Sequence, residues 1–169
     1  MDFEYDVASL YNAERAMRER WPSHIISAMG PAVGYMSVGD HHLVVEFDDT
    51  EVNNPESKWV AATRDDIERI FAFTKNLKDG DRLLVHCQAG HGRSPAILMG
   101  VLMQHGMSAD DACESVLGIR SAAIPNRMIV DIIDDVLSTE GALGTRVAAY
   151  YKKLLIPGVN LPDRGDYMA

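Results

Sequence analysis

The hydrophobic pattern of the chain predicts short strands in its first half and helices in its second. Three apolar runs have the length and the β-branched content of buried strands: "SHIISAM" (23–29), "HLVVEF" (42–47) and "RLLVHC" (82–87). The second strand is followed by "DDTEVNNPES" (48–57), which is rich in turn-forming residues and is therefore predicted to be a loop.

Five segments have apolar residues at helical spacing or the capping residues that are typical of helix ends. They are 63–77, 94–106, 109–118, 125–137 and 145–155. Thr63 and Asp66 form an N-cap pair for the first, and Pro95 suits the first turn of the second. Because no long linker or repeat interrupts this pattern, we expect one domain over 1–156 and an irregular tail over 157–169.

The order of these elements indicates the fold class. A strand, a helix, a strand, a loop and a helix follow one another between 42 and 106, which is typical of an α/β protein with a central, partly parallel sheet flanked by helices. Ligands of such sheets bind beyond the carboxyl ends of the strands. The segment 85–94 lies at one such end.

Charge and composition exclude several classes of function. The 169 residues are 47% hydrophobic and carry a net charge of −9, which argues against binding to nucleic acids or to anionic membranes. No secretory signal and no apolar run of about 18 residues is visible. With only Cys87 and Cys113, a reducing cytoplasm is the simpler expectation, and Cys113 is expected to pack in the core. The adjacent His41 and His42 are expected to be solvated, and no metal site or other cofactor is expected.

The candidate chemistry lies in "VHCQAGHGRS" (85–94), which runs from a predicted strand into a predicted helix. Gly90 and Gly92 permit backbone conformations closed to other residues, so the turn can point successive N–H groups inward, at the positive end of the helix dipole. The planar guanidinium of Arg93 can bind two oxygens at once. The sequence therefore predicts an anion-binding loop made of Gln88, Ala89, Gly90, His91, Gly92 and Arg93.

Cys87 is expected at the floor of this loop. The groups that favour a bound anion also favour a thiolate, so the loop would bind a tetrahedral dianion and aim a nucleophilic sulfur at its centre. That chemistry is phosphoryl transfer through a cysteinyl phosphate. His86 can donate a hydrogen bond that orders the loop, and the Ser94 hydroxyl can stabilise the thiolate when the sulfur leaves again.

"HCQAGHGRS" resembles the H-C-x5-R-[ST] signature of the cysteine-dependent protein tyrosine phosphatases, and most closely their small dual-specificity-like branch. The resemblance extends over 23–137, where "AAIPN" (122–126) is similar to the segment before a later helix of the family; the first 20 residues and the part after Leu155 show none. It implies a four- to five-stranded, partly parallel sheet flanked by helices. It also implies a metal-independent phosphatase that acts on phosphorylated proteins, and we expect a monomer.

Loss of the alcohol from a phosphate ester needs a general acid, since an alkoxide or phenoxide leaves poorly unless it is protonated. In the family this acid is an aspartate upstream of the cysteine, and "EFDDTEV" (46–52) offers Asp48 and Asp49. Strand alternation would turn Asp49 to the side of Phe47 and Asp48 away from it. The family pattern also favours Asp49, although both residues would equally suit the start of a loop.

The substrate class stays open at this point. Phosphotyrosine proteins are the first expectation, with phosphoserine and phosphothreonine also considered. Phosphoinositide phosphatases of the superfamily often carry basic residues inside the loop, where this chain has Gln88 and His91, and only His91 can be cationic. A phosphoinositide or inositol phosphate substrate is therefore the second hypothesis. The third is a non-catalytic module that captures phosphorylated partners, against which the intact Cys87, Arg93 and Asp49 argue.

Overall fold

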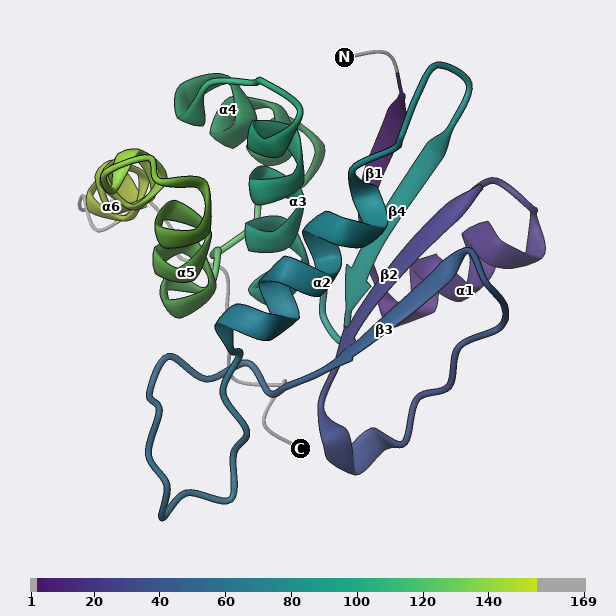
Figure 1. Ribbon diagram of the computed structural model, residues 1–169, viewed down its shortest axis with the longest axis horizontal. Coiled ribbons are helices and arrows are strands. Elements are labelled where there is room, and N and C mark those ends of the chain that lie inside the picture. Colours follow the sequence, from purple (N-terminus) through teal and green to yellow (C-terminus); the bar gives the residue numbers. More distant parts are fainter. Residues whose placement is uncertain (1–2, 155–169) are drawn as a thin grey trace.

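The computed structural model describes residues 3–154 (Figure 1). Its strands are β1 (Glu4–Ser9), β2 (His24–Met29), β3 (His42–Glu46) and β4 (Arg82–Cys87). Its helices are α1 (Leu10–Arg18), η1 (Pro31–Val33, a short 3-10 helix), α2 (Arg64–Thr74), α3 (Arg93–Gln104), α4 (Ala109–Ile119), α5 (Arg127–Leu137) and α6 (Ala142–Leu154). The predicted tail (157–169) and the predicted domain end at residue 156 lie outside the described residues.

The four strands form one sheet in the order β1-β4-β2-β3, and all neighbouring pairs are parallel. This confirms the α/β class and the three predicted strands, and it shows more parallel pairing than the partly parallel sheet we expected. The edge strand β1 and the following helix α1 were not predicted. The six residues of β1, "EYDVAS", include Glu4 and Asp6. Glutamate and aspartate are depleted in strands, so the strand propensity of this segment is too weak to predict β1.

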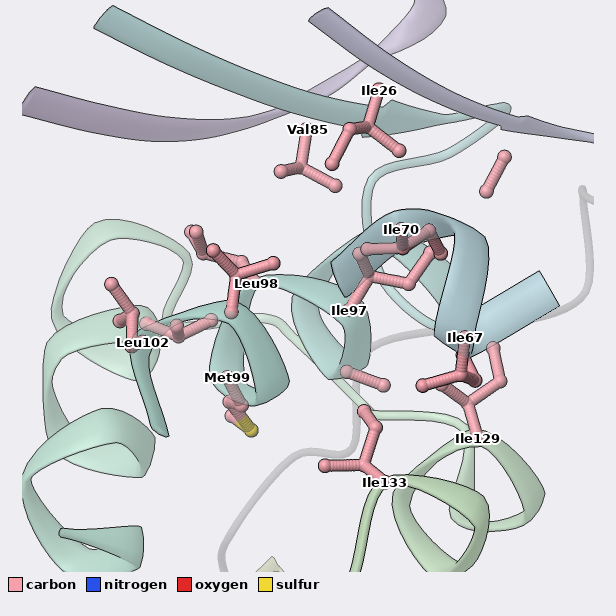
Figure 2. Close-up of a cluster of buried hydrophobic side chains, with 14 of the residues drawn as sticks. Ile26, Ile67, Ile70, Val85, Ile97, Leu98, Met99, Leu102, Ile129 and Ile133 are labelled. Atoms are coloured by element: carbon pink, nitrogen blue, oxygen red, sulfur yellow. The ribbon is translucent and has the colours of Figure 1, made fainter. Parts of the chain in front are cut away.

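Helices cover both faces of the sheet. In Figure 1, α2 to α6 lie on one side of the sheet and α1 lies on the other. Figure 2 shows Ile26 of β2 and Val85 of β4 pointing from the sheet toward Ile97 and Leu98 of α3. Because α3 is buried from Arg93 to Leu102, the start of this helix has a fixed position against the sheet.

The local end signals read from the sequence are present in the structure. Thr63 and Asp66 form a reciprocal capping box at the start of α2, although this helix ends at Thr74 and not at residue 77. Ser108 caps α4 with its hydroxyl, and Cys113 of α4 is fully buried, as expected. One expectation was wrong: His42 is only 6% exposed, so it is not a solvated residue.

Between residues 3 and 154, no helix combines the length and the apolar character that a membrane crossing requires. The same residues contain no group of three or more His, Cys, Asp or Glu side chains placed to hold a metal ion.

Candidate active site

The site lies at the carboxyl end of β4, a central strand of the sheet. Cys87 is the last residue of β4 and is paired in register with Ser9 of β1 and Ala28 of β2. Five residues separate it from Arg93, the first residue of α3. The predicted strand, turn and helix are therefore confirmed, and the loop 88–92 has structured backbone on both sides.

The backbone of this loop is held from outside by hydrogen bonds to each of its carbonyl oxygens. The oxygens of residues 88 to 92 accept, in order, from Leu10 N (3.1 Å), Arg120 Nη2 (3.0 Å), Arg120 Nε (3.2 Å), Ile124 N (2.7 Å) and Asn126 N (3.1 Å). In a planar trans peptide the N–H points away from the C=O, so the N–H groups of residues 89 to 93 point to the inner side of the loop. The arrangement is that of an anion-binding nest.

Gly90 is required by this conformation for two reasons. Its φ of +74° lies in the left-handed region, where side chains are disfavoured. A Cβ on Gly90 would also come within 2.7 Å of the backbone of Ala8 and Ser9. The loop is thus packed directly against the corner between β1 and α1, the part of the chain that the sequence pattern did not predict.

Cys87 is 1% exposed, and its sulfur lies inside the loop. The Gly90 N–H donates to Sγ at 3.2 Å, and the Ser94 hydroxyl lies 3.3 Å from the same sulfur. Cys87, Gly90 and Ser94 therefore come together as the sequence predicted.

Arg93 joins the loop to the segment that carries the two aspartates. It is 6% exposed, and its Nη1 donates to the Phe47 carbonyl oxygen at 2.8 Å. Its Nε–H is buried and has no hydrogen-bond partner among the described residues. A buried donor left open beside a ring of inward N–H groups is what an anion site needs, because an unpaired buried donor is otherwise costly.

The two aspartates have different surroundings. Asp48 accepts from the Val60 N–H at 2.7 Å and so closes the loop between β3 and α2. Asp49 lies against the anion loop instead: a Cβ added to Gly92 would collide with its Oδ2. The geometry therefore brings Asp49, and not Asp48, to the loop that holds Cys87.

Asn126 holds Asp49 in this position and was missed as a site residue. Its side-chain amide donates to Asp49 Oδ1 (2.8 Å) and to the Thr50 carbonyl (3.0 Å), and its side-chain oxygen caps α5. Its backbone N–H is also the donor to the Gly92 carbonyl. An asparagine directly before an amphipathic helix signals an N-cap, which was the available sequence clue.

Arg120 is the second residue that the sequence reading missed. Besides its two bonds to the loop, its Nη2 lies 3.2 Å from His91 Nε2. Since a guanidinium can only donate, His91 Nε2 is the acceptor in this contact. The Gln88 side chain is exposed, so its contribution to the loop is through its backbone.

His86 lies behind the loop, on the face of the sheet opposite Cys87, and is fully buried. Its Nε2 is 2.5 Å from the hydroxyl of Ser27, its register partner in β2. Burial lowers the pKa of His86 to about 4, and a backbone hydrogen bond with Cys87 acts in the opposite direction. His86 is therefore a neutral ring at neutral pH.

This neutral histidine predicts an acid-sensitive fold. The unfolded chain binds a proton at His86 near pH 6.5 and the folded chain only near pH 4, so stability is complete above pH 6.5 and is lost as the pH falls. We expect His86 to account for a loss of about 3 kcal/mol in the free energy of unfolding between pH 7 and pH 4. Urea unfolding of wild type and His86→Gln across this range measures it; parallel pH profiles of the two proteins would contradict the assignment.

Comparison with models of protein families identifies one family. The family model described as "Dual specificity phosphatase, catalytic domain" matches residues 23–134. A search of curated protein sequences gave no match at the significance required. Among solved structures, human DUSP28 has a TM-score of 0.59 at 20% identity, with 80% of this chain and 89% of that chain covered.

Two further structures show the range of the fold. Cydia pomonella PTP-2 phosphatase has a TM-score of 0.58 at 23% identity, covering 78% of this chain and 84% of that one. PTPMT1 in complex with PI(5)P has a TM-score of 0.55 at 15% identity, covering 88% and 94%. At identities this low, these likenesses concern the fold alone.

Proposed function

The chain belongs to the dual specificity phosphatase family, a branch of the cysteine-based phosphatases, and on this premise we propose that it hydrolyses phosphorylated tyrosine residues of proteins, with phosphoserine and phosphothreonine as further substrates. The observation that carries the proposal is the anion loop itself. Its carbonyl oxygens are all bonded outward, Cys87 Sγ accepts from the N–H of Gly90, and the buried Nε–H of Arg93 has no partner among the described residues.

In the first step of the proposed reaction, the Cys87 thiolate attacks phosphorus and the bond from phosphorus to the ester oxygen breaks. The inward N–H groups and Arg93 stabilise the charge on the non-bridging oxygens. Asp49 gives its proton to the leaving oxygen. The products of this step are the free alcohol or phenol and a phosphocysteine.

In the second step, water attacks the phosphocysteine, gives a proton to Asp49, and the sulfur–phosphorus bond breaks. The released thiolate keeps the electron pair of that bond. The Ser94 hydroxyl, 3.3 Å from the sulfur, donates to it and makes it a better leaving group. Phosphate is released and Asp49 is protonated again for the next cycle.

The side chains of residues 88–93 support protein substrates over phosphoinositides. Arg93 is the permanently cationic side chain among them, and His91 Nε2 accepts from Arg120. Phosphoinositide phosphatases of the superfamily often carry additional basic residues in this loop. The proposal is tested by comparing kcat/KM for a phosphotyrosine peptide with that for short-chain phosphoinositides, with EDTA present; higher kcat/KM on the lipids would overturn the protein assignment.

Replacing Asp49 by alanine should lower kcat for phosphothreonine peptides by roughly 10²- to 10⁴-fold, the usual contribution of general acid catalysis. The loss should be smaller for para-nitrophenyl phosphate, whose leaving group needs less help from an acid. The matched control is Asp48→Ala, which removes the hydrogen bond from the Val60 N–H. This variant should lower the stability of the protein and should slow the two substrates by the same factor. Equal losses for both variants on both substrates would argue against Asp49 as the acid.

A further inference from the structure

Two tyrosines of α6 bind the connection between α4 and α5 through their hydroxyls. The Tyr150 hydroxyl donates to the Ala123 carbonyl oxygen at 3.0 Å, and the Ser121 carbonyl oxygen lies 3.3 Å from the same hydroxyl. The Tyr151 hydroxyl donates to the Pro125 carbonyl oxygen at 2.7 Å. The same connection supplies backbone donors to the anion loop, so the two hydroxyls lie one layer behind the candidate active site.

The Tyr150 hydroxyl is joined to the anion loop through two peptide planes. It donates to the C=O of the peptide that joins Ala123 to Ile124. The N–H of that peptide donates to the His91 carbonyl oxygen at 2.7 Å. The His91 carbonyl shares its peptide with the N–H of Gly92, which points to the inner side of the loop. Because these peptides are trans, the C=O and N–H of each point in opposite directions, and the hydrogen bonds form a first continuous row from α6 to the loop.

The Tyr151 hydroxyl begins a second row of the same kind. It donates to the C=O of the peptide that joins Pro125 to Asn126. The N–H of that peptide donates to the Gly92 carbonyl oxygen at 3.1 Å. The Gly92 carbonyl shares its peptide with the N–H of Arg93, the next inward group. The two tyrosines therefore lie at the outer ends of two rows that end at different N–H groups of the anion loop.

Both rows are buried where they cross the connection between α4 and α5. Ala123 is fully buried, and Ile124 and Asn126 are 5% and 1% exposed. Hydrogen bonds in series polarise one another, and at a buried position solvent does not screen this effect. Burial also raises the pKa of Tyr150, so its hydroxyl keeps the proton that it donates.

The position of α6 has other sources of support besides the two hydroxyls. Leu143 and Val147 of α6 are buried in the core. Arg146 Nε lies 2.9 Å from Asp110 Oδ1 of α4. A substitution of tyrosine by phenylalanine therefore removes the hydroxyl while the ring and the helix keep their packing.

We propose that Tyr150 and Tyr151 are positioning residues for the phosphate-binding N–H groups of Gly92 and Arg93. Each hydroxyl fixes one peptide plane of the connection and polarises the N–H that this plane gives to the loop. The loop carbonyl that accepts this N–H belongs to the peptide whose own N–H binds the phosphate oxygens. The consequence for catalysis rests on the proposed function, whereas the consequence for anion binding does not.

The first test follows the two rows separately by amide ¹H–¹⁵N correlation spectra. In Tyr150→Phe, the amide signals of Ile124 and Gly92 should move upfield, because an N–H is less polarised when the C=O of its own peptide loses a hydrogen bond. In Tyr151→Phe, the two corresponding shifts should appear in the second row instead. Equal shifts along both rows in each variant, or unchanged amides of Gly92 and Arg93, would overturn the proposal whatever the protein does as an enzyme.

The second test measures the anion site by calorimetric titration with inorganic phosphate. Tyr150→Phe and Tyr151→Phe should each weaken phosphate binding by about threefold, less than the roughly tenfold upper limit for one direct hydrogen bond. We expect kcat/KM for para-nitrophenyl phosphate to fall by about the same factor. The matched control is Thr139→Val, which removes a hydroxyl bond to Asp134 between α5 and α6. This control should lower the free energy of unfolding and keep the phosphate affinity of wild type.

The outcomes separate the role of the tyrosines from the proposed function. Weaker phosphate binding in both tyrosine variants of a protein that hydrolyses no phosphate ester would support the two rows and overturn the proposed function. Wild-type phosphate affinity in both tyrosine variants, or an equal loss in Thr139→Val, would show that the hydroxyls serve only the packing of α6.

Discussion

A Cys87→Ser variant is expected to lose catalysis by on the order of 10⁴- to 10⁶-fold toward para-nitrophenyl phosphate, while it still binds phosphate and phosphopeptides. The size follows from removing a nucleophile that acts as a unit with its surroundings. Binding should survive because the N–H groups of residues 89 to 93 are oriented by the outward carbonyl bonds and not by the sulfur. Steady-state hydrolysis in the presence of EDTA measures the loss of catalysis, and calorimetric titration with a phosphopeptide measures the remaining binding.

Cys113→Ser is the matched control, because it makes the same atomic change at a fully buried position in α4. Cys113→Ser is expected to lower the free energy of unfolding and to leave the rate of hydrolysis nearly unchanged. If wild type itself shows no hydrolysis but binds phosphopeptides as tightly as Cys87→Ser does, the chain is a binding module and the proposed function fails. Trapping of a phosphocysteine by acid quench in wild type, and its absence in Cys87→Ser, would establish the covalent step.

The second large effect is expected for Arg93→Lys, which keeps the charge and removes the planar guanidinium. We expect kcat/KM to fall by roughly 10³- to 10⁵-fold, the range found for an arginine aimed at a transferring phosphoryl group. Two parts of the Arg93 guanidinium have different surroundings: Nη1 donates to the carbonyl of Phe47, two residues before Asp49, and the buried Nε–H has no partner among the described residues and is free to bind an anion. A lysine can make at most one of these two contacts, because it is a point charge without the paired donors.

The two contacts can be separated experimentally. Loss of the anion contact weakens binding of vanadate or phosphate, whereas loss of the Phe47 contact displaces Asp49 and makes the rate depend more strongly on the leaving group. We expect Arg93→Lys to show both changes, and the double variant Arg93→Lys/Asp49→Ala to lose less than the sum of the single losses. A variant with wild-type vanadate affinity would contradict the assignment of Arg93 to the anion.

Some features could be read from the sequence because local interactions decide them. The strand 82–87, the glycine turn and the start of α3 come from runs of apolar residues, the freedom of Gly90 and the end signals of a helix. Each of these depends on residues within one or two turns of one another. The placement of Cys87, Arg93 and Ser94 in one loop follows from that segment alone.

Other features depend on contacts between segments that are distant in the chain, and only the tertiary structure decides them. The carbonyl oxygens of the loop are held by Leu10 at the start of α1 and by Arg120, Ile124 and Asn126 of the connection between α4 and α5. The choice of Asp49 over Asp48 depends on Gly92 and on Asn126, 77 positions further along the chain. No local pattern encodes such pairings, because the packing of the sheet and its helices sets them.

The same reason explains the two clearest errors of the sequence reading. β1 and α1 have weak patterns of their own, yet β1 pairs with β4 along its length and its final corner contacts Gly90. His42 has the sequence surroundings of an exposed residue, yet the sheet pairs it with Ile25 of β2 and its buried ring contacts the Ser27 hydroxyl. The sequence by itself determined the chemical groups and the loop that carries Cys87. The fold determined which distant side chains hold that loop and place Asp49 beside it, because these contacts depend on long-range packing and not on neighbouring residues.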